Sequence, residues 1–235
     1  MQNLAKIASS SCALASCPIT SASAVTARPT SPATTSSVDP TDAAYLMARA
    51  VDGLEHAHVA TTHDGQPLRL VHRDFSPSNI LVSYDGSVKI IDFGIAKADV
   101  DRERTAQGII KGKVRYMSPE QIRGVDVDAR SDVYSLGVIL FELLTGKVPF
   151  ERASAINTLM AHISDELPRL DPSLKASTPV EETVRKCLAK DPEARFGSMQ
   201  DVLATLKYAS SSVVGAHPYE SMPPEGRVSL TPSST

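Results

Sequence analysis

The chain has 235 residues, of which 42% are hydrophobic and 22% charged, and its formal net charge at pH 7 is -3. These values are typical of a globular protein with one sizeable core, and the small negative charge argues against a nucleic-acid-binding surface. No run approaches the roughly 20 apolar residues that a membrane-spanning helix needs. The three cysteines are too few and too scattered for a disulfide framework, which favours a reducing, cytoplasmic location.

Residues 1–38 are predicted to form a disordered head of low sequence complexity. The first 40 residues contain 9 Ser, 5 Thr and 8 Ala, so this stretch cannot bury enough apolar surface to offset its chain entropy. The run Leu14–Cys17 resembles a lipoprotein cleavage site, but serines interrupt the apolar stretch that such a leader requires. We therefore do not favour a membrane anchor at Cys17. The other interpretation of the head is a stretch read from a misplaced gene start.

An ordered domain is predicted over residues 39–208, and its first element is a helix. Asp39 can cap this helix, and Pro40 suits its first position. Apolar residues then recur every four positions at Leu46, Ala50 and Leu54, as expected for the buried face of a helix of about 16–18 residues. A turn follows at Asp64-Gly65.

Two short β segments are predicted next, at Ile80–Ser83 and Val88–Ile91. The Asp85-Gly86 pair between them favours a hairpin. Residues 97–113 are polar and show little periodicity, which predicts a long loop.

The stretch Asp132–Leu144 is apolar on almost every side, which predicts a helix buried at the centre of the domain and ended by Gly146. Further helices are expected at 153–164, 179–189 and 199–208. Residues 209–235 are predicted to be a disordered tail. The predicted fold class is α+β, mainly α: a helical bundle with short β hairpins.

Five motifs occur in a fixed order. They are Val71–Asn79, with the pattern H-R-D-x-x-x-x-N, Asp92–Gly94, Ser118–Glu120, Asp132–Gly137 and Lys190–Phe196. They resemble the catalytic loop, the D-F-G, the A-P-E, the central helix and the late arginine of eukaryotic-type (bacterial Hanks-type) serine/threonine protein kinases. The resemblance covers about residues 42–207, and it implies the C-lobe of the protein kinase fold.

The resemblance implies a transfer of the ATP γ-phosphate to a hydroxyl of a protein substrate, with Mg²⁺ as cofactor. Asp74 would accept or orient the proton of that hydroxyl. Asn79 and Asp92 would hold the magnesium ions that bridge the phosphates, because hard oxygen ligands suit Mg²⁺. Leu81 would form the floor under the adenine.

Other residues receive structural or regulatory roles from the resemblance. The structural residues are His72, Arg73, Phe93, Gly94, Glu120, Asp132 and Arg195. Among them, Asp132 would accept hydrogen bonds from the backbone of the catalytic loop, and Glu120 would pair with Arg195. Thr105 is the candidate phosphorylation site, because it is the only Ser or Thr between Gly94 and Ser118 and a phosphate can order a loop against Arg73.

The sequence departs from the family at two positions beside the catalytic aspartate. Ser76 occupies the place where the family has a lysine, and Lys113 occupies the place of a threonine before the A-P-E. We hypothesise that the two have exchanged roles, so that Lys113 supplies the cation and Ser76 the hydroxyl. The other interpretation is a solvent-facing lysine and a degraded site.

The family's Gly-rich loop and its strand lysine have no counterpart, and no glycine precedes Gly53. The expectation is therefore a C-lobe whose N-lobe is missing, which binds ATP well only if an N-lobe is supplied and is inactive alone. Two functions remain open: a serine/threonine kinase represented by a truncated fragment, and a non-catalytic kinase-like docking module.

Overall fold

The computed structural model describes residues 37–83, 87–93, 113–174, 176 and 178–211. The predictions for the head, the tail and the 97–113 loop fall largely outside these residues. The helices are α2 (Pro40–His58), α4 (Pro119–Arg123), α5 (Ala129–Thr145), α6 (Ala155–Ser164), α7 (Thr178–Cys187) and α8 (Met199–Ser211). The strands are β1 (Ile80–Val82) and β2 (Val88–Ile90), and short 3-10 turns occur at Pro77–Asn79, Lys113–Tyr116, Pro172–Leu174 and Pro192–Ala194. In the described residues the fold is thus mainly helical, as predicted, with a single two-stranded sheet where short hairpins were expected.

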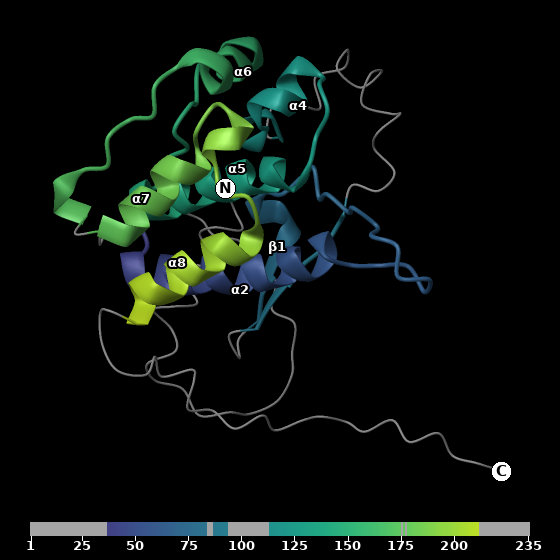
Figure 1. Ribbon diagram of the computed structural model, residues 1–235. Helices are drawn as coiled ribbons and strands as arrows, with labels where there is room; N and C mark the ends of the chain where they lie inside the picture. The colour runs from purple at the N-terminus through teal and green to yellow at the C-terminus, as the bar shows by residue number, and fades with distance from the viewer. Residues whose placement is uncertain (1–36, 84–86, 94–112, 175, 177, 212–235) are drawn as a thin grey trace, which may run out of the picture.

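Helix α5 forms the centre of the molecule, and the other long helices pack around it (Figure 1). All residues from Ser131 to Leu144 are buried. The helix begins three residues earlier than the apolar pattern predicts, because the Asp128 side chain accepts a hydrogen bond from the Arg130 amide and caps it. Gly146 ends the helix with φ 72°, a left-handed conformation that glycine adopts without strain.

Helices α2 and α8 lie side by side against one face of α5 (Figure 1). The predicted start of α2 is confirmed: the Asp39 carboxylate accepts from the Thr41 amide at 2.8 Å, and Pro40 opens the helix. The buried face is rotated slightly from the predicted stripe. Met47 is buried, whereas Leu46 is only partly buried.

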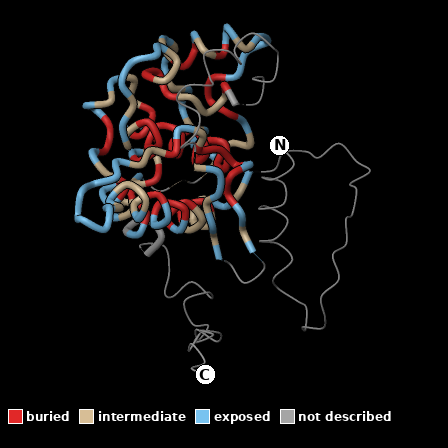
Figure 2. Tube along the Cα trace, turned by 90° about the vertical axis from the view of Figure 1, so that its right-hand side faces the viewer, coloured by how far each residue is buried: buried red, intermediate tan, exposed pale blue. Residues whose placement is uncertain are grey.

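The two strands of the predicted hairpin are present, and β2 packs against α2, whereas the predicted Asp85-Gly86 turn lies outside the described residues. The two strands pair antiparallel with Leu81 opposite Lys89. Figure 2 shows that buried positions gather in the helical body, whereas the hairpin strands carry mainly intermediate and exposed positions. The close approach of β2 to α2 leaves little room at Gly53, where an added Cβ would lie 3.2 Å from the Ile90 side chain.

Helices α6, α7 and α8 appear close to the predicted positions, and α4 is an addition that the periodicity did not reveal. Helix α4 has only five residues, too few to show a helical repeat. None of the helices in the described ranges is both long and apolar enough to cross a bilayer.

Candidate active site

The loop His72–Asp74 is fixed to the start of the central helix by one buried carboxylate. Asp132 accepts a hydrogen bond from the His72 amide at 2.7 Å through Oδ2 and from the Arg73 amide at 3.0 Å through Oδ1. Arg73 has φ 63°, an uncommon conformation for a residue with a side chain. The two hydrogen bonds hold this strained turn, so the contact expected of Asp132 is present.

Asn79 links the other two predicted active-site segments. Its side-chain Nδ2 donates to the backbone carbonyl oxygen of Asp74 at 2.8 Å. The backbone carbonyl oxygen of Asn79 accepts a hydrogen bond from the Ile91 amide at 3.0 Å. The first bond connects the loop to the start of β1, and the second brings the residue before Asp92 alongside. Asn79 itself is buried, Asp74 is half-buried and Asp92 is exposed. Two hydrogen bonds through one residue therefore assemble the three segments.

His72 makes a second connection between the loop and the segment after β2. Its Nε2 lies 3.0 Å from the Ile91 carbonyl oxygen, and its ring centroid lies 4.7 Å from that of Phe93. The imidazole is fully buried. The His72 side chain thus holds the backbone on which Asp92 sits.

The donor set of Asn79 and Asp92 fits a magnesium ion. Because the Asn79 Nδ2 is the donor to Asp74, the amide oxygen keeps its lone pairs for a ligand. Asp92 offers an exposed carboxylate at φ 61°, beside the segment that Asn79 holds. Mg²⁺ needs only one or two protein carboxylate or amide ligands when phosphates supply further oxygens. The part of the chain that the structure describes contains no group of three or more His, Cys, Asp or Glu arranged to hold a metal by themselves.

Ser76 is buried, and its hydroxyl lies 2.8 Å from that of Ser78. It supplies no positive charge to the site. Lys113 is the first residue of a 3-10 turn, and the next residue, Val114, is buried. The Lys113 side chain, Gly94 and Thr105 lie outside the described part of the chain.

The segment that follows the 3-10 turn Lys113–Tyr116 is held against the catalytic loop by Gln121, a residue that the motif analysis missed. Ser118 and Gln121 form a reciprocal capping box at the start of α4. The Gln121 Nε2 also donates to the Arg73 carbonyl oxygen at 2.7 Å. The sequence did carry a signal for this residue, because Ser followed three positions later by Gln marks a helix start.

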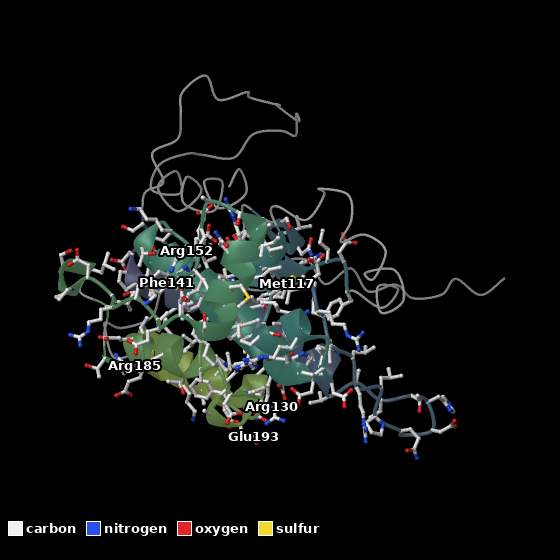
Figure 3. The ribbon with its side chains drawn as sticks, turned by 90° about the horizontal axis from the view of Figure 1, so that it is seen from above. Met117, Arg130, Phe141, Arg152, Arg185 and Glu193 are labelled. Atoms are coloured by element: carbon white, nitrogen blue, oxygen red, sulfur yellow. The ribbon has the colours of Figure 1, made fainter. Side chains whose placement is uncertain are left out.

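Glu120 and Arg195 form the expected pair, and both side chains are buried. The guanidinium donates from Nη1 and Nη2 to the two carboxylate oxygens at 2.7 and 2.8 Å. Burial by itself raises the pKa of Glu120, but hydrogen bonds from Arg195 and Ser131 outweigh it and lower the pKa to about 2. A more exposed pair, Arg130 with Glu193, lies at the surface of the same region (Figure 3).

Two apolar side chains are exposed on the hairpin and directly after it. Leu81 is 48% exposed and Ile91 is 38% exposed.

The motifs, the central helix and the linked loops are those of a protein kinase. The family model described as "Protein kinase domain" matches residues 23–209, so the chain belongs to the protein kinase family.

Curated relatives agree with this assignment. The chain is 44% identical over 179 residues to the tyrosine-protein kinase MasK of Myxococcus xanthus, a match covering 74% of this chain and 27% of that protein. It is 39% identical over 173 residues to the serine/threonine-protein kinase PrkC of Bacillus subtilis, covering 72% and 25%. It is 38% identical over 169 residues to the serine/threonine-protein kinase PknB of Mycobacterium leprae, covering 71% and 26%. The chain therefore spans about a quarter of the length of these relatives.

Proposed function

We propose that this chain is the catalytic and substrate-binding part of a serine/threonine protein kinase, which transfers the ATP γ-phosphate to a protein hydroxyl. The observation that carries the proposal is the linkage through Asn79. The Asn79 side chain donates to the backbone carbonyl of Asp74, and the Asn79 backbone carbonyl accepts from the amide of Ile91, the residue before Asp92. This arrangement supports a site with two acids and one amide around a common point.

In this proposal Asp74 accepts the proton of the substrate hydroxyl or orients it for attack. Asn79 and Asp92 hold magnesium, which would bridge the phosphates and neutralise charge as it develops on the transferred group. The chain contributes positioning: Asp132 fixes the loop that carries Asp74, and Asn79 fixes the loop to the hairpin.

We also propose that the roof of the ATP site is supplied from outside these 235 residues. The sequence has no Gly-rich loop and no strand lysine of the kinase type. The exposed Leu81 would then be the floor under the adenine. Without a roof, the chain should bind ATP weakly and transfer phosphate negligibly.

The exchange of Ser76 and Lys113 belongs to the same proposal. The buried Ser76 cannot provide a cation, and Lys113 stands in the turn that leads to the Ser118–Gln121 box. Gln121 binds the Arg73 carbonyl, which places this segment against the catalytic loop. A lysine on a flexible stem can serve as a point charge from this second anchor.

The test of the function is a chimera in which the part of PrkC that precedes its match to this chain is fused ahead of residue 39. The chimera should phosphorylate a generic protein substrate with Mg²⁺ and ATP, and the chain alone should not. Asp74→Asn should abolish transfer, whereas Asp64→Asn, at an exposed turn, should leave it unchanged. A chimera no more active than its Asp74→Asn variant would refute the proposal.

The same chimera tests the exchanged lysine. Lys113→Thr should lower the rate by about 10³–10⁵, the range known for loss of one cationic group in phosphoryl transfer, and Lys147→Thr at an exposed site is the control. Adding Ser76→Lys should restore most of the rate. If the double variant is no better than Lys113→Thr, the exchange is wrong.

Thr105 remains the proposed activating phosphorylation site, since the Arg73 side chain is exposed and available to a phosphate. Thr105→Ala in the chimera should lower activity, and unchanged activity would remove this role. The acceptor is read in the same assay by phosphoamino acid analysis. Phosphoserine and phosphothreonine are expected, and because one relative carries the name of a tyrosine-protein kinase, phosphotyrosine alone would reassign the acceptor.

The second function, a non-catalytic docking module, is favoured by the exposed apolar hairpin surface around Leu81 and Ile91. Nucleotide titration of the chain alone tests it. The module is supported if the chain binds no nucleotide and the chimera transfers no phosphate, and it is excluded if the chimera is active.

A further inference from the structure

Helix α6 presents an outer face that carries no charged side chain. The exposed residues of the helix are Ile156, Asn157, Met160 and Ser164, and the side chains of Ile156 and Met160 are 72% and 54% exposed. The only titratable residue of the helix, His162, is buried. Figure 1 shows α6 at the outer edge of the molecule, across α5 from α2 and α8. The face of α6 that meets solvent is therefore uncharged, and its largest side chains are apolar.

Helix α7, which also lies at the surface, has the opposite composition. Its outward positions carry Glu181, Glu182, Arg185 and Lys186, and none of these is buried. A helix with one side in water normally carries charged or polar residues on that side. A single exposed apolar side chain needs no explanation, but α6 lacks a charge along its whole exposed face. This face therefore has the composition of one that packs against another helix.

The apolar residues of α6 also have the spacing of a seam between two helices. Ile156, Met160 and the half-buried Ile163 follow one another at intervals of four and three residues. At 3.6 residues per turn, these three positions lie within about 60° of arc around the helix axis. Alternating intervals of three and four residues align apolar side chains along one stripe, as in two helices that pack side by side.

The ends of this stripe favour a second copy of the same chain. Arg152 and Asp165 are the charged residues nearest to the two ends of α6 in the sequence, and they form an ion pair with each other. Two copies that meet along α6 therefore bring no uncompensated charge together at these positions. In an antiparallel pair with its two-fold axis at the middle of the stripe, Ile156 of each copy lies against Met160 of the other. The face is thus complementary to itself.

We propose that the outer face of α6 is a self-association surface, to which a second copy of this chain binds through its own α6 in the antiparallel orientation. The contact is small, because a helix of ten residues is only about 15 Å long. Stable interfaces bury about 1,200–2,000 Å², so this dimer is weak and reversible. The association involves neither ATP nor Asp74, and its test therefore stands apart from that of the proposed function.

The experiment measures the apparent mass of the full chain by sedimentation equilibrium with a reductant, at concentrations from about 1 µM to about 1 mM. The apparent mass should rise with concentration toward that of a dimer. Ile156→Lys and Met160→Glu, made separately, should each weaken association at least about tenfold, because each places a charge against an apolar side chain. Glu182→Lys on α7 and Gln200→Glu on α8, both at exposed positions, are the controls and should leave association unchanged.

An equimolar mixture of the Ile156→Lys and Met160→Glu chains tests the occupant and its orientation. In the antiparallel pair the new lysine of one copy faces the new glutamate of the other, so the mixture should associate again. In a parallel pair the two substituted positions would not meet. Recovery in the mixture also shows that the single variants are folded.

Three results would each overturn the proposal. The native chain could remain monomeric over the whole concentration range. The single variants could associate as strongly as the native chain, which would place the contact elsewhere. The mixture could fail to associate although both variants keep the Tm of the native chain, which would exclude the antiparallel pairing of α6 with its own copy.

Discussion

Removal of the Arg195 side chain should destabilise the helical body far more than removal of an exposed arginine. Arg195 makes two hydrogen bonds to Glu120, and it also donates to the carbonyl oxygens of Ala189, Lys190 and Arg130 at 2.8, 3.2 and 2.9 Å. In Arg195→Ala all these donors are lost, and a buried carboxylate is left without its partner.

The expected cost follows from this burial. Loss of one member of a buried, hydrogen-bonded ion pair costs about 3–5 kcal/mol. For a chain of this size each kcal/mol lowers the Tm by about 2–4 °C, so the shift should be about 6–20 °C. Exposed pairs one helical turn apart contribute only about 0.3–0.5 kcal/mol. Arg185 forms such a pair with Glu181 on α7 at 2.9 Å and lies at the edge of the molecule (Figure 3).

Thermal unfolding followed by circular dichroism at pH 7 compares Arg195→Ala with the matched Arg185→Ala. A second measurement compares the Tm values of the native chain and Arg195→Ala at different pH. In the native chain the depressed pKa of Glu120, about 2, gives stability that is present above about 4.5 and is lost as pH falls toward 2. Without Arg195, burial raises the pKa of Glu120. Protonation of Glu120 at lower pH then removes the unpaired buried charge that destabilises the variant. The difference in Tm between the native chain and Arg195→Ala should therefore shrink between pH 7 and pH 4.

Two results would refute this reasoning. The first is a Tm shift for Arg195→Ala no larger than that for Arg185→Ala. The second is a large shift that stays the same at pH 7 and pH 4, because it would come from packing and not from the stranded charge of Glu120.

Two further predictions concern the core. An added Cβ at Gly137 would lie 2.6 Å from the Cβ of Cys187, so Gly137→Ala should force α5 and α7 apart and lower the free energy of unfolding in urea by about 1–3 kcal/mol. Gly197→Ala, where an added Cβ meets only one side-chain oxygen at 3.9 Å, should be nearly neutral, and equal midpoints for the two would contradict the close approach. Burial lowers the pKa of His162 from 6.5 to about 4. As the pH falls, the unfolded chain therefore takes up a proton at His162 before the native chain does, and the free energy of unfolding should fall by about 2 kcal/mol between pH 7 and pH 4.5. His162→Gln should flatten this dependence and the exposed His56→Gln should not; an unchanged slope in His162→Gln would show that other groups cause it.

Long elements with a strong apolar pattern could be predicted from the sequence. The cap at Asp39 and the repeat that follows it predicted α2, and the continuous apolar stretch predicted α5 as the buried centre. The start of α5 was missed because it depends on the polar cap Asp128, which no apolar pattern reports. Helix α4 was missed because five residues show no repeat.

The motif residues could be predicted from their order, but their supporting contacts could not. His58 lies 74 positions before Asp132 in the sequence, and Gln121 lies 48 positions after Arg73. Such pairs are formed by the packing of α2 against the central helix and by the contact of α4 with the catalytic loop, which local periodicity does not encode. The Asp64-Gly65 turn was predictable in the same limited sense, because its residue types mark a turn but do not show that His58 and His72, on either side of it, meet at Asp132.

The anchoring of the loop by Asp132 determines what a covering lobe would change in the proposed kinase. Asp132 lies in the first turn of a helix that is buried on every side, so its displacement would require the core to repack. The loop that carries Asp74, and the link through Asn79, therefore depend on the helical body and not on a covering lobe. In the proposed kinase a roof would then add nucleotide contacts to a preformed floor, and its absence would weaken ATP binding more than it disturbs the catalytic loop.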